Sequence, residues 1–137
     1  MDERVVYING EVVPESQAKI SIRDQGFTHG DAVFDVTRTF GHEIWKLGEH
    51  VDRLYESIRY LRIGPVMPKE EMINLSRQVF EANQPLLGEN DDYWLTQRVS
   101  RGVPGDGPTV IIECKPLPWH RAKYYREGVE VYTPSVR

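Results

Sequence analysis

The sequence predicts an α+β domain, in which an antiparallel sheet carries two main helices. Three observations support this class. A strand-like run at residues 32–40 is joined by Gly41-His42 to a returning run at residues 43–47, which predicts a β-hairpin. Residues 48–61 carry apolar side chains at helical spacing. Residues 109–114 are rich in β-branched side chains, which is typical of a central strand.

Composition limits the possible functions. The chain has 137 residues, enough for one domain with a hydrophobic core. A formal net charge of -4 gives no electrostatic reason to expect nucleic acid as a partner. Cys114 is the single cysteine, which excludes an intramolecular disulfide and favours a cytoplasmic setting. We find no membrane-spanning run, no signal-peptide core and no internal repeat, and we predict no metal site.

The N-terminal region contains a second hairpin signal. Residues 5–8 and 11–13 flank Asn9-Gly10, a dipeptide that strongly favours a tight hairpin turn. Residues 19–23 alternate apolar and polar side chains and are predicted as a short strand. Residues 24–26 are predicted as a turn.

Two helices are predicted in the middle of the chain. Gly64-Pro65 ends the first, because a glycine and a proline follow its last apolar position. Pro68 is placed in the first turn of the second. The buried stripe of the second helix is predicted to comprise Met72, Leu75, Val79 and Phe80.

The C-terminal third is predicted to be mainly strands. A polar loop at residues 83–92 leads to a strand at residues 93–100, which we pair with residues 109–114 across a flexible connection. Lys115-Pro116 is expected to end the sheet there. A short helix is predicted at residues 119–127, ended by Gly128, and a last strand at residues 129–132.

Three polar side chains stand out from these patterns. Arg38 shares a strand face with Phe34 and Val36, where a charge requires a partner. It either reaches solvent or pairs with a local carboxylate. His50 and Arg53 lie one helical turn apart, and spacing alone favours an ordinary solvated charge for Arg53.

Three segments resemble the small N-terminal domain of the class IV, or fold-type IV, pyridoxal-phosphate aminotransferases. They are YINGEVV at 7–13, HGDAVFDVTRTF at 29–40 and EHVDRLYESIRYLRI at 49–63. That family includes branched-chain and D-amino acid aminotransferases, R-selective amine transaminases and aminodeoxychorismate lyases. The segment VYTPSVR at 131–137 is similar to the family's approach to its catalytic lysine.

The resemblance implies roles for individual residues. The arginine of the family's His-x-x-Arg-Leu element binds the cofactor phosphate, and here that residue is Arg53. A forked, permanently charged guanidinium suits a phosphate dianion. Thr96 stands where branched-chain enzymes have tyrosine. The substrate pocket implied by matching positions comprises His29, Phe34, Arg38, Thr96 and Arg98.

The resemblance also implies what this chain lacks. The family lysine that bonds to pyridoxal phosphate and moves the substrate proton belongs to a C-terminal large domain, as does the carboxylate that pairs with the pyridine nitrogen. None of the five lysines here stands in the family's lysine context. We therefore expect residues 1–137 to be the small domain of a longer, homodimeric enzyme, without catalytic residues and inactive alone.

The substrate class is less sharply indicated. Arg38 and Arg98 favour branched-chain or other apolar amino acids, with 2-oxoglutarate as the acceptor. His29 and the Asp35-Val36 pair are more similar to R-selective amine transaminases, and D-amino acid transaminases and lyases share the fold. A non-catalytic binding module is the remaining alternative, with an aromatic contact patch comprising Trp94, Trp119, Tyr124 and Tyr125.

Overall fold

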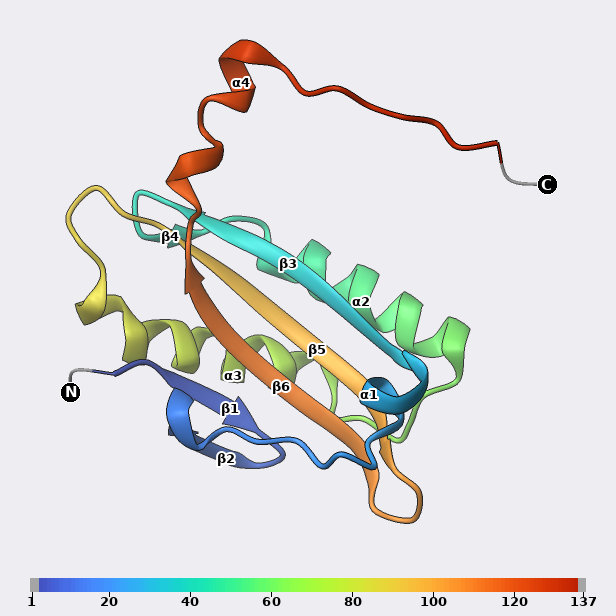
Figure 1. The fold of residues 1–137 in the computed structure, drawn as a ribbon. Helices are drawn as coiled ribbons and strands as arrows, with labels where there is room; N and C mark the ends of the chain where they lie inside the picture. Colours follow the sequence, from blue (N-terminus) through green and yellow to red (C-terminus); the bar gives the residue numbers. More distant parts are fainter. Residues whose placement is uncertain (1–2, 136–137) are drawn as a thin grey trace.

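The computed structural model describes residues 3–135 and confirms the α+β class (Figure 1). The strands are β1 (Val5–Ile8), β2 (Glu11–Pro14), β3 (Ala32–Phe40), β4 (Glu43–Ile44), β5 (Tyr93–Val103) and β6 (Gly107–Pro116). The α-helices are α1 (Gln25–His29), α2 (Leu47–Leu61), α3 (Lys69–Asn83) and α4 (Tyr124–Glu127). Short 3-10 turns occur at η1 (Glu15–Gln17), η2 (Gln84–Leu86) and η3 (Trp119–Arg121).

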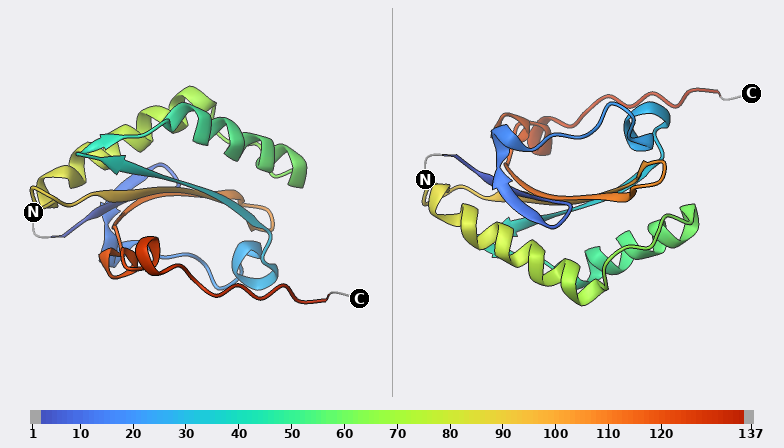
Figure 2. Two further views of the ribbon diagram at one scale, coloured as in Figure 1. Left: turned by 90° about the horizontal axis from the view of Figure 1, so that it is seen from above. Right: turned by 90° about the horizontal axis from the view of Figure 1, so that it is seen from below.

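The six strands form one sheet in the order β2-β1-β6-β5-β3-β4, and every pairing is antiparallel. Helices α2 and α3 cover one face of this sheet, whereas α1 and α4 lie on the opposite side (Figure 2). We call the side opposite α2 and α3 the open face. Strand alternation and register place six residues of β3 and β5 on it: Phe34, Val36, Arg38, Trp94, Thr96 and Arg98.

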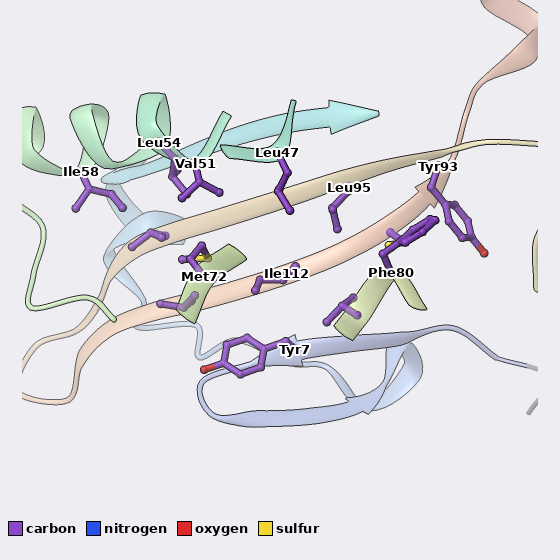
Figure 3. Packing of buried hydrophobic residues seen from close by; sticks show 14 of the residues in the cluster. Tyr7, Leu47, Val51, Leu54, Ile58, Met72, Phe80, Tyr93, Leu95 and Ile112 are labelled. Carbon is purple, nitrogen blue, oxygen red and sulfur yellow. The ribbon is translucent and has the colours of Figure 1, made fainter. Parts of the chain in front are cut away.

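The hydrophobic core lies between the sheet and the two long helices (Figure 3). Alternate residues of β5 point into it, because successive side chains of a strand face opposite ways. These residues meet apolar side chains of both helices, and the most buried members are Val51, Leu54, Met72, Val79, Leu95, Val99 and Ile112. The core therefore uses only one face of the sheet.

Local signals determine several elements as predicted. β3 has the predicted bounds, and the first hairpin turns at Asn9-Gly10, where both residues have positive φ. α2 ends at Leu61, its last predicted apolar position, but the residue that ends it is Arg62 rather than Gly64-Pro65. Arg62 is in the left-handed conformation, and its N–H donates to the carbonyls of Ile58 and Arg59. Pro68 is the N-cap of α3 rather than part of its first turn.

The predicted strand at residues 19–23 is wrong. Ile20 and Ile22 are 46% and 79% exposed, and this loop has no strand partner in the described part of the chain. The predicted turn at residues 24–26 instead begins α1, because the Asp24 side chain caps the helix at Gly26 N. An alternating pattern without a neighbouring strand thus leaves only a loop.

Three strand lengths also differ from prediction, and one of them is β5, which continues past Ser100 to Val103. The returning strand stops at Ile44, because Leu47 already begins α2 and is buried in the core. β6 continues to Pro116, which pairs with Tyr93 of β5. On its other side β1 pairs only with Ile111 and Ile112, so the missing proline N–H breaks no hydrogen bond there.

The last predicted strand, at residues 129–132, does not form. Val129 and Val131 are 64% and 78% exposed, and no strand lies beside them in the structure of residues 3–135. The helix predicted before it is present as two short pieces, η3 and α4, and Gly128 ends it as predicted.

Candidate active site

Strand register brings three of the predicted pocket residues together on the open face. Phe34 of β3 pairs with Arg98 of β5, and Val36 pairs with Thr96. The Arg98 guanidinium carbon lies 5.4 Å from the centre of the Phe34 ring. Phe34 is 63% exposed, whereas Thr96 is buried. An aromatic surface and a cation therefore lie side by side on the open face.

Arg98 is held by a carboxylate that the sequence did not reveal. Its Nε and Nη2 donate to Oε1 of Glu113 at 3.0 and 2.8 Å. Lys115 lies 3.2 Å from the other oxygen of Glu113. The three residues come from neighbouring strands β5 and β6, and Thr96 pairs directly with Glu113. Arg98 and Glu113 lie on different strands, so their pairing depends on the strand register, which residue spacing in the sequence does not determine.

Arg38 pairs with a carboxylate, but with a distant one in the sequence. Its Nη2 lies 3.5 Å from Oδ2 of Asp92, and its Nε donates to the Thr39 carbonyl at 2.9 Å. The guanidinium also lies 3.9 Å from the centre of the Phe40 ring. The prediction of a carboxylate partner is thus confirmed, whereas its description as local is wrong.

Asp92 organises this end of the sheet. Its Oδ1 accepts hydrogen bonds from Thr39 Oγ1 at 2.5 Å and from the His42 backbone at 3.2 Å. Burial raises the pKa of this carboxyl, but the hydrogen bonds from Thr39, His42 and Gly41, with the charge of Arg38, hold it below the usual range.

His29 lies apart from the other pocket candidates. It is the exposed last residue of α1, and its Nδ1 lies 2.8 Å from the Thr28 hydroxyl. Beneath α1 is a cavity of about 270 Å³, which Phe27 and Arg98 both line. α1 therefore forms one wall of the space beside Arg98, with His29 at its end.

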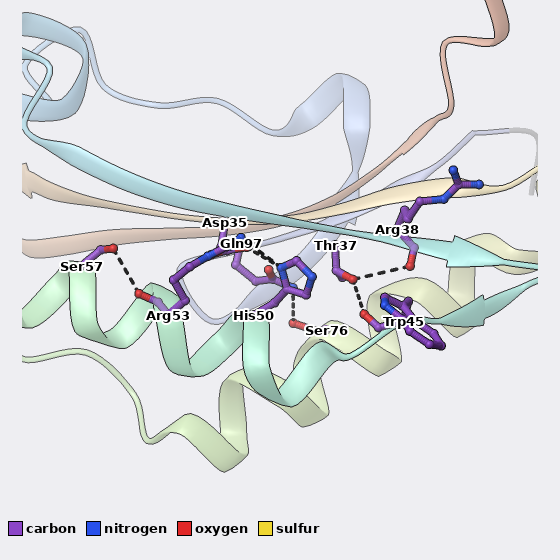
Figure 4. Close-up of polar contacts among 9 residues, drawn as sticks. All are labelled: Asp35, Thr37, Arg38, Trp45, His50, Arg53, Ser57, Ser76 and Gln97. Atoms are coloured by element: carbon purple, nitrogen blue, oxygen red, sulfur yellow. Dashed lines mark hydrogen bonds and ion pairs between the residues drawn. The ribbon is translucent and has the colours of Figure 1, made fainter. Parts of the chain in front are cut away.

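Arg53, the candidate phosphate ligand, lies on the other side of β3. Its Nε donates to Oδ2 of Asp35 at 2.6 Å and its Nη2 to Oδ1 at 2.8 Å (Figure 4). His50 Nδ1 lies 2.7 Å from the same Oδ1. Asp35 is 5% exposed, whereas 66% of the Arg53 side chain is exposed. One edge of the guanidinium is thus fixed by a buried acid.

Electrostatics reinforce this arrangement. Burial raises the pKa of Asp35, but hydrogen bonds from Arg53 and His50, together with their charges, hold it below the usual range. The same carboxylate raises the pKa of Arg53 through the hydrogen bonds and the opposite charge. The sequence places His50 and Arg53 on one helix face, as the structure has them. Asp35 was not predicted as the acid that holds Arg53 and His50, although it directly follows Phe34 in the sequence.

The Arg53 side chain retains capacity for an anion. Its Nη1 has no hydrogen-bond partner within residues 3–135. The Arg53 side chain also lines a groove of about 870 Å³. The groove is lined by further cations, Arg59 and Arg62, and by one acid, Glu56. Donors of this kind fit a phosphate group.

The open face and Arg53 are separated by one strand. β4 pairs only with Thr39 and Phe40, so residues 32–38 of β3 have no strand on their outer side in the described structure. A ligand beside this edge could contact both faces of β3. The domain therefore does not bring Arg53 and Arg98 into one cavity; it places them on either side of an open edge.

The five lysines are not placed as a buried nucleophile would be. None of them is buried, and Lys46, Lys69 and Lys115 lie within 4 Å of the acids Glu49, Asp52 and Glu113. Residues 136 and 137, the end of the segment VYTPSVR, lie outside the described residues.

Comparison with known proteins identifies the class. A family model for amino-transferase class IV matches residues 32–137. The chain belongs to this family. It is 33% identical over 140 residues to a Methanocaldococcus jannaschii protein provisionally named a branched-chain-amino-acid aminotransferase, covering 96% of this chain and 46% of that protein. It is also 32% identical over 79 residues to the D-alanine aminotransferase of Staphylococcus aureus strain N315, covering 58% of this chain and 28% of the relative.

Solved structures share the fold. The branched-chain amino acid aminotransferase of Escherichia coli superposes with a TM-score of 0.72 at 21% identity, over 84% of this chain and 41% of that chain. The branched-chain aminotransferase of the archaeon Thermoproteus uzoniensis, solved with norvaline, superposes with a TM-score of 0.72 at 20% identity, again over 84% and 41%. The present chain thus spans less than half the length of these relatives and matches their small-domain fold.

Two further findings concern other types of site. Among the helices of residues 3–135, none combines the length and apolar character needed to span a bilayer. The same residues contain no group of three or more histidine, cysteine or acidic side chains arranged to hold a metal ion.

Proposed function

We propose that this chain is the small domain of an enzyme that transfers the amino group of a branched-chain or other apolar amino acid to 2-oxoglutarate, using pyridoxal 5'-phosphate. Membership of the class IV family supports an aminotransferase. The name of the Methanocaldococcus jannaschii relative supports branched-chain substrates. We further propose a cytoplasmic homodimer, with the reactive lysine and the partner of the pyridine nitrogen in a C-terminal large domain.

The observation that carries the proposal is the orientation of Arg53. Asp35 holds its Nε and Nη2, so that Nη1 faces outward at the edge of β3. A phosphate bound there would accept charge-assisted hydrogen bonds from a guanidinium that is already fixed, which lowers the entropy lost on binding. Arg53 thus binds the phosphate, and Asp35 orients Arg53.

The open face recognises the substrates in this proposal. Phe34 and Val36 provide apolar contact for the side chain of the donor, and Thr96 adds a small polar neighbour. Arg98 and Arg38 provide cations for the carboxylates of the amino acid and the 2-oxo acid. Because Glu113 and Asp92 hold these guanidinium groups, they keep fixed directions as substrates exchange.

When bound, pyridoxal phosphate supplies the electron sink that stabilises negative charge at the substrate carbon. This chain supplies binding and orientation. His29 does not line the cavity beside Arg98, but as the exposed last residue of α1 it is proposed to contact the substrate from the end of that helix.

Cofactor affinity tests the proposal. In the complete polypeptide, Arg53→Ala should weaken pyridoxal phosphate binding by about 2–4 kcal/mol, because charge-assisted hydrogen bonds are lost. Arg77→Ala, at an exposed arginine of α3, is the matched control and should leave the dissociation constant unchanged. Equilibrium dialysis of the two variants measures both values. Equal affinities for Arg53→Ala and the unaltered protein would remove Arg53 from the site.

A second candidate is transamination of R-amines or D-amino acids. It is favoured by His29 and by Val36 after Asp35, a pattern similar to the R-selective enzymes, and by the D-alanine aminotransferase relative. A panel of leucine, D-alanine and R-1-phenylethylamine separates these donors. Turnover of R-1-phenylethylamine without leucine would reverse the ranking. Pyruvate release from aminodeoxychorismate would indicate a lyase, and lack of turnover with tight protein binding would indicate a non-catalytic module.

A further inference from the structure

A single buried carboxylate ties α1 to the sheet. Asp24 is 2% exposed, and its Oδ1 accepts the Gly26 N–H at 2.7 Å. Its Oδ2 accepts hydrogen bonds from Ser100 Oγ at 2.9 Å and Thr109 Oγ1 at 2.6 Å. Ser100 belongs to β5 and Thr109 to β6, and the two pair directly across the strands. The first turn of α1 is therefore attached to both central strands.

The backbone of α1 approaches β5 very closely at this point. A Cβ atom added at Gly26 would lie 2.6 Å from the Ser100 Cβ and 2.9 Å from Asp24 Oδ1. No real side chain tolerates such a contact without movement, so glycine is required here for packing rather than for its backbone angles. We call the three hydrogen bonds accepted by Asp24 the latch. The latch and the close approach of Gly26 to Ser100 are two independent reasons why α1 lies against β5 and β6.

The position of α1 determines the shape of the space beside Arg98. The cavity of about 270 Å³ is bounded by Phe27 and Gly26 of α1 on one side and by Arg98 of β5 on the other. Phe27 is 68% exposed, so the helix is not held by burial of this side chain. At its other end, α1 is followed by Asp31, whose carbonyl accepts the Arg101 N–H at 3.0 Å. Loss of the Asp24 contacts would thus let the first turn of α1 swing while Asp31 stays attached.

We propose that Asp24 is a positioning residue for the substrate pocket, a role that rests on the proposed function. By holding α1 against β5 and β6, Asp24 keeps Phe27 as the wall of the cavity that Arg98 lines. Asp24 forms no hydrogen bond with Arg53 or Asp35, whose ion pair joins α2 to the helix-covered side of β3. Release of α1 should therefore impair recognition of substrate carboxylates and leave cofactor binding unaltered.

Two variants displace α1 by different means. Asp24→Ala removes the latch, and Gly26→Ala inserts a methyl group against Ser100 without changing any charge. In the complete enzyme each should raise the KM of the 2-oxo acid acceptor about tenfold while kcat changes by less than about twofold, since misplacement of a binding wall weakens ground-state binding. The dissociation constant of pyridoxal phosphate should stay within about twofold of the unaltered value.

Two further variants serve as rescue and control. Asp24→Asn keeps an acceptor for Gly26 N–H, and the Ser100 and Thr109 hydroxyls can turn to accept from its amide, so KM should remain near the unaltered value. Gly48→Ala, in the first turn of α2, adds the same methyl group where no atom lies within 4 Å, and it should change nothing. An unchanged KM in both Asp24→Ala and Gly26→Ala, or an equal loss of cofactor affinity, would overturn the proposal.

Limited proteolysis reports the position of α1 without any activity. Arg23 is exposed and directly precedes the buried Asp24, so trypsin reaches the bond between them only when this turn opens. In the 137-residue chain, Gly26→Ala should be cut there about tenfold faster than the unaltered chain and than Gly48→Ala. Asp24→Ala changes the residue next to the cleaved bond, so its rate is divided by its rate in the urea-unfolded chain, and the ratio should rise about tenfold as well. Unchanged cleavage would show that Asp24 does not hold α1. Faster cleavage of these variants, together with a complete enzyme that shows no transaminase activity, would instead refute the proposed function while supporting the role of Asp24 in holding α1.

Discussion

Arg53 and Asp35 form a two-point ion pair that links α2 to β3, with N–O distances of 2.6 and 2.8 Å. The acid is buried and the base is mostly exposed. The pair therefore satisfies a carboxylate beneath the helix and at the same time gives the guanidinium a fixed direction.

This relationship predicts how acid affects stability. The pKa of Asp35 is lower in the folded chain than in the unfolded chain, so the unfolded chain binds more protons as the pH falls. The stabilisation should be fully present at neutral pH and lost as the pH falls through the folded-state pKa of Asp35. Urea unfolding of the unaltered chain and of Asp35→Asn, between about pH 7 and pH 3, measures the effect. The free-energy difference between them, about 1–2 kcal/mol at neutral pH, should shrink in acid; a constant difference would contradict the assignment.

Substitution of Asn83 should greatly lower the stability of the folded chain. It is fully buried, accepts the Val5 N–H through Oδ1 at 2.8 Å, and donates through Nδ2 to the carbonyls of Val5 at 2.9 Å and Val79 at 2.8 Å. Asn83→Ala leaves these buried backbone groups unpaired and should lower the free energy of unfolding by about 2–4 kcal/mol. Glu81→Ala, at an exposed position of the same helix, provides the control. Chemical denaturation that shows the same midpoint for both variants would refute this role.

Cys114 should be inert in the folded chain. Burial raises the pKa of its thiol to about 12, and the residue is 3% exposed. Since the thiolate is the reactive form, alkylation at about pH 8 should proceed only through unfolding. The labelling rate with iodoacetamide should rise in proportion to the unfolded fraction in urea. Rapid labelling without denaturant would show that the strand β6 opens locally.

The placement of the lysines indicates how the isolated chain should react with pyridoxal phosphate. None of the five is buried, and the amines of three form ion pairs with acids, so none is set apart from the others as a reactive amine. Pyridoxal phosphate and borohydride should therefore give no adduct concentrated on one lysine. Peptide mapping by mass spectrometry detects such labelling. A single modified lysine would mean that this chain carries its own reactive amine.

Elements that depend on local chemistry could be predicted from the sequence. The bounds of β3, the turn at Asn9-Gly10 and the last apolar position of α2 follow from residue periodicity and turn residues, whereas Arg62 rather than Gly64-Pro65 caps α2. The expectation that Phe34, Thr96 and Arg98 lie together came from family resemblance, and the register of β3 and β5 brings them to one face.

Partners far apart in the chain were decided only by the tertiary structure. Periodicity shows that Asp35 and Phe34 point in opposite directions, but not which direction the helices cover. Residues 129–132 have strand-like composition but no neighbouring strand in the described structure, so they form none. Pro116 is part of a strand because Tyr93 of β5 lies beside it. Local propensity is set within a few residues, whereas a strand or an ion pair exists only once its partner arrives through folding.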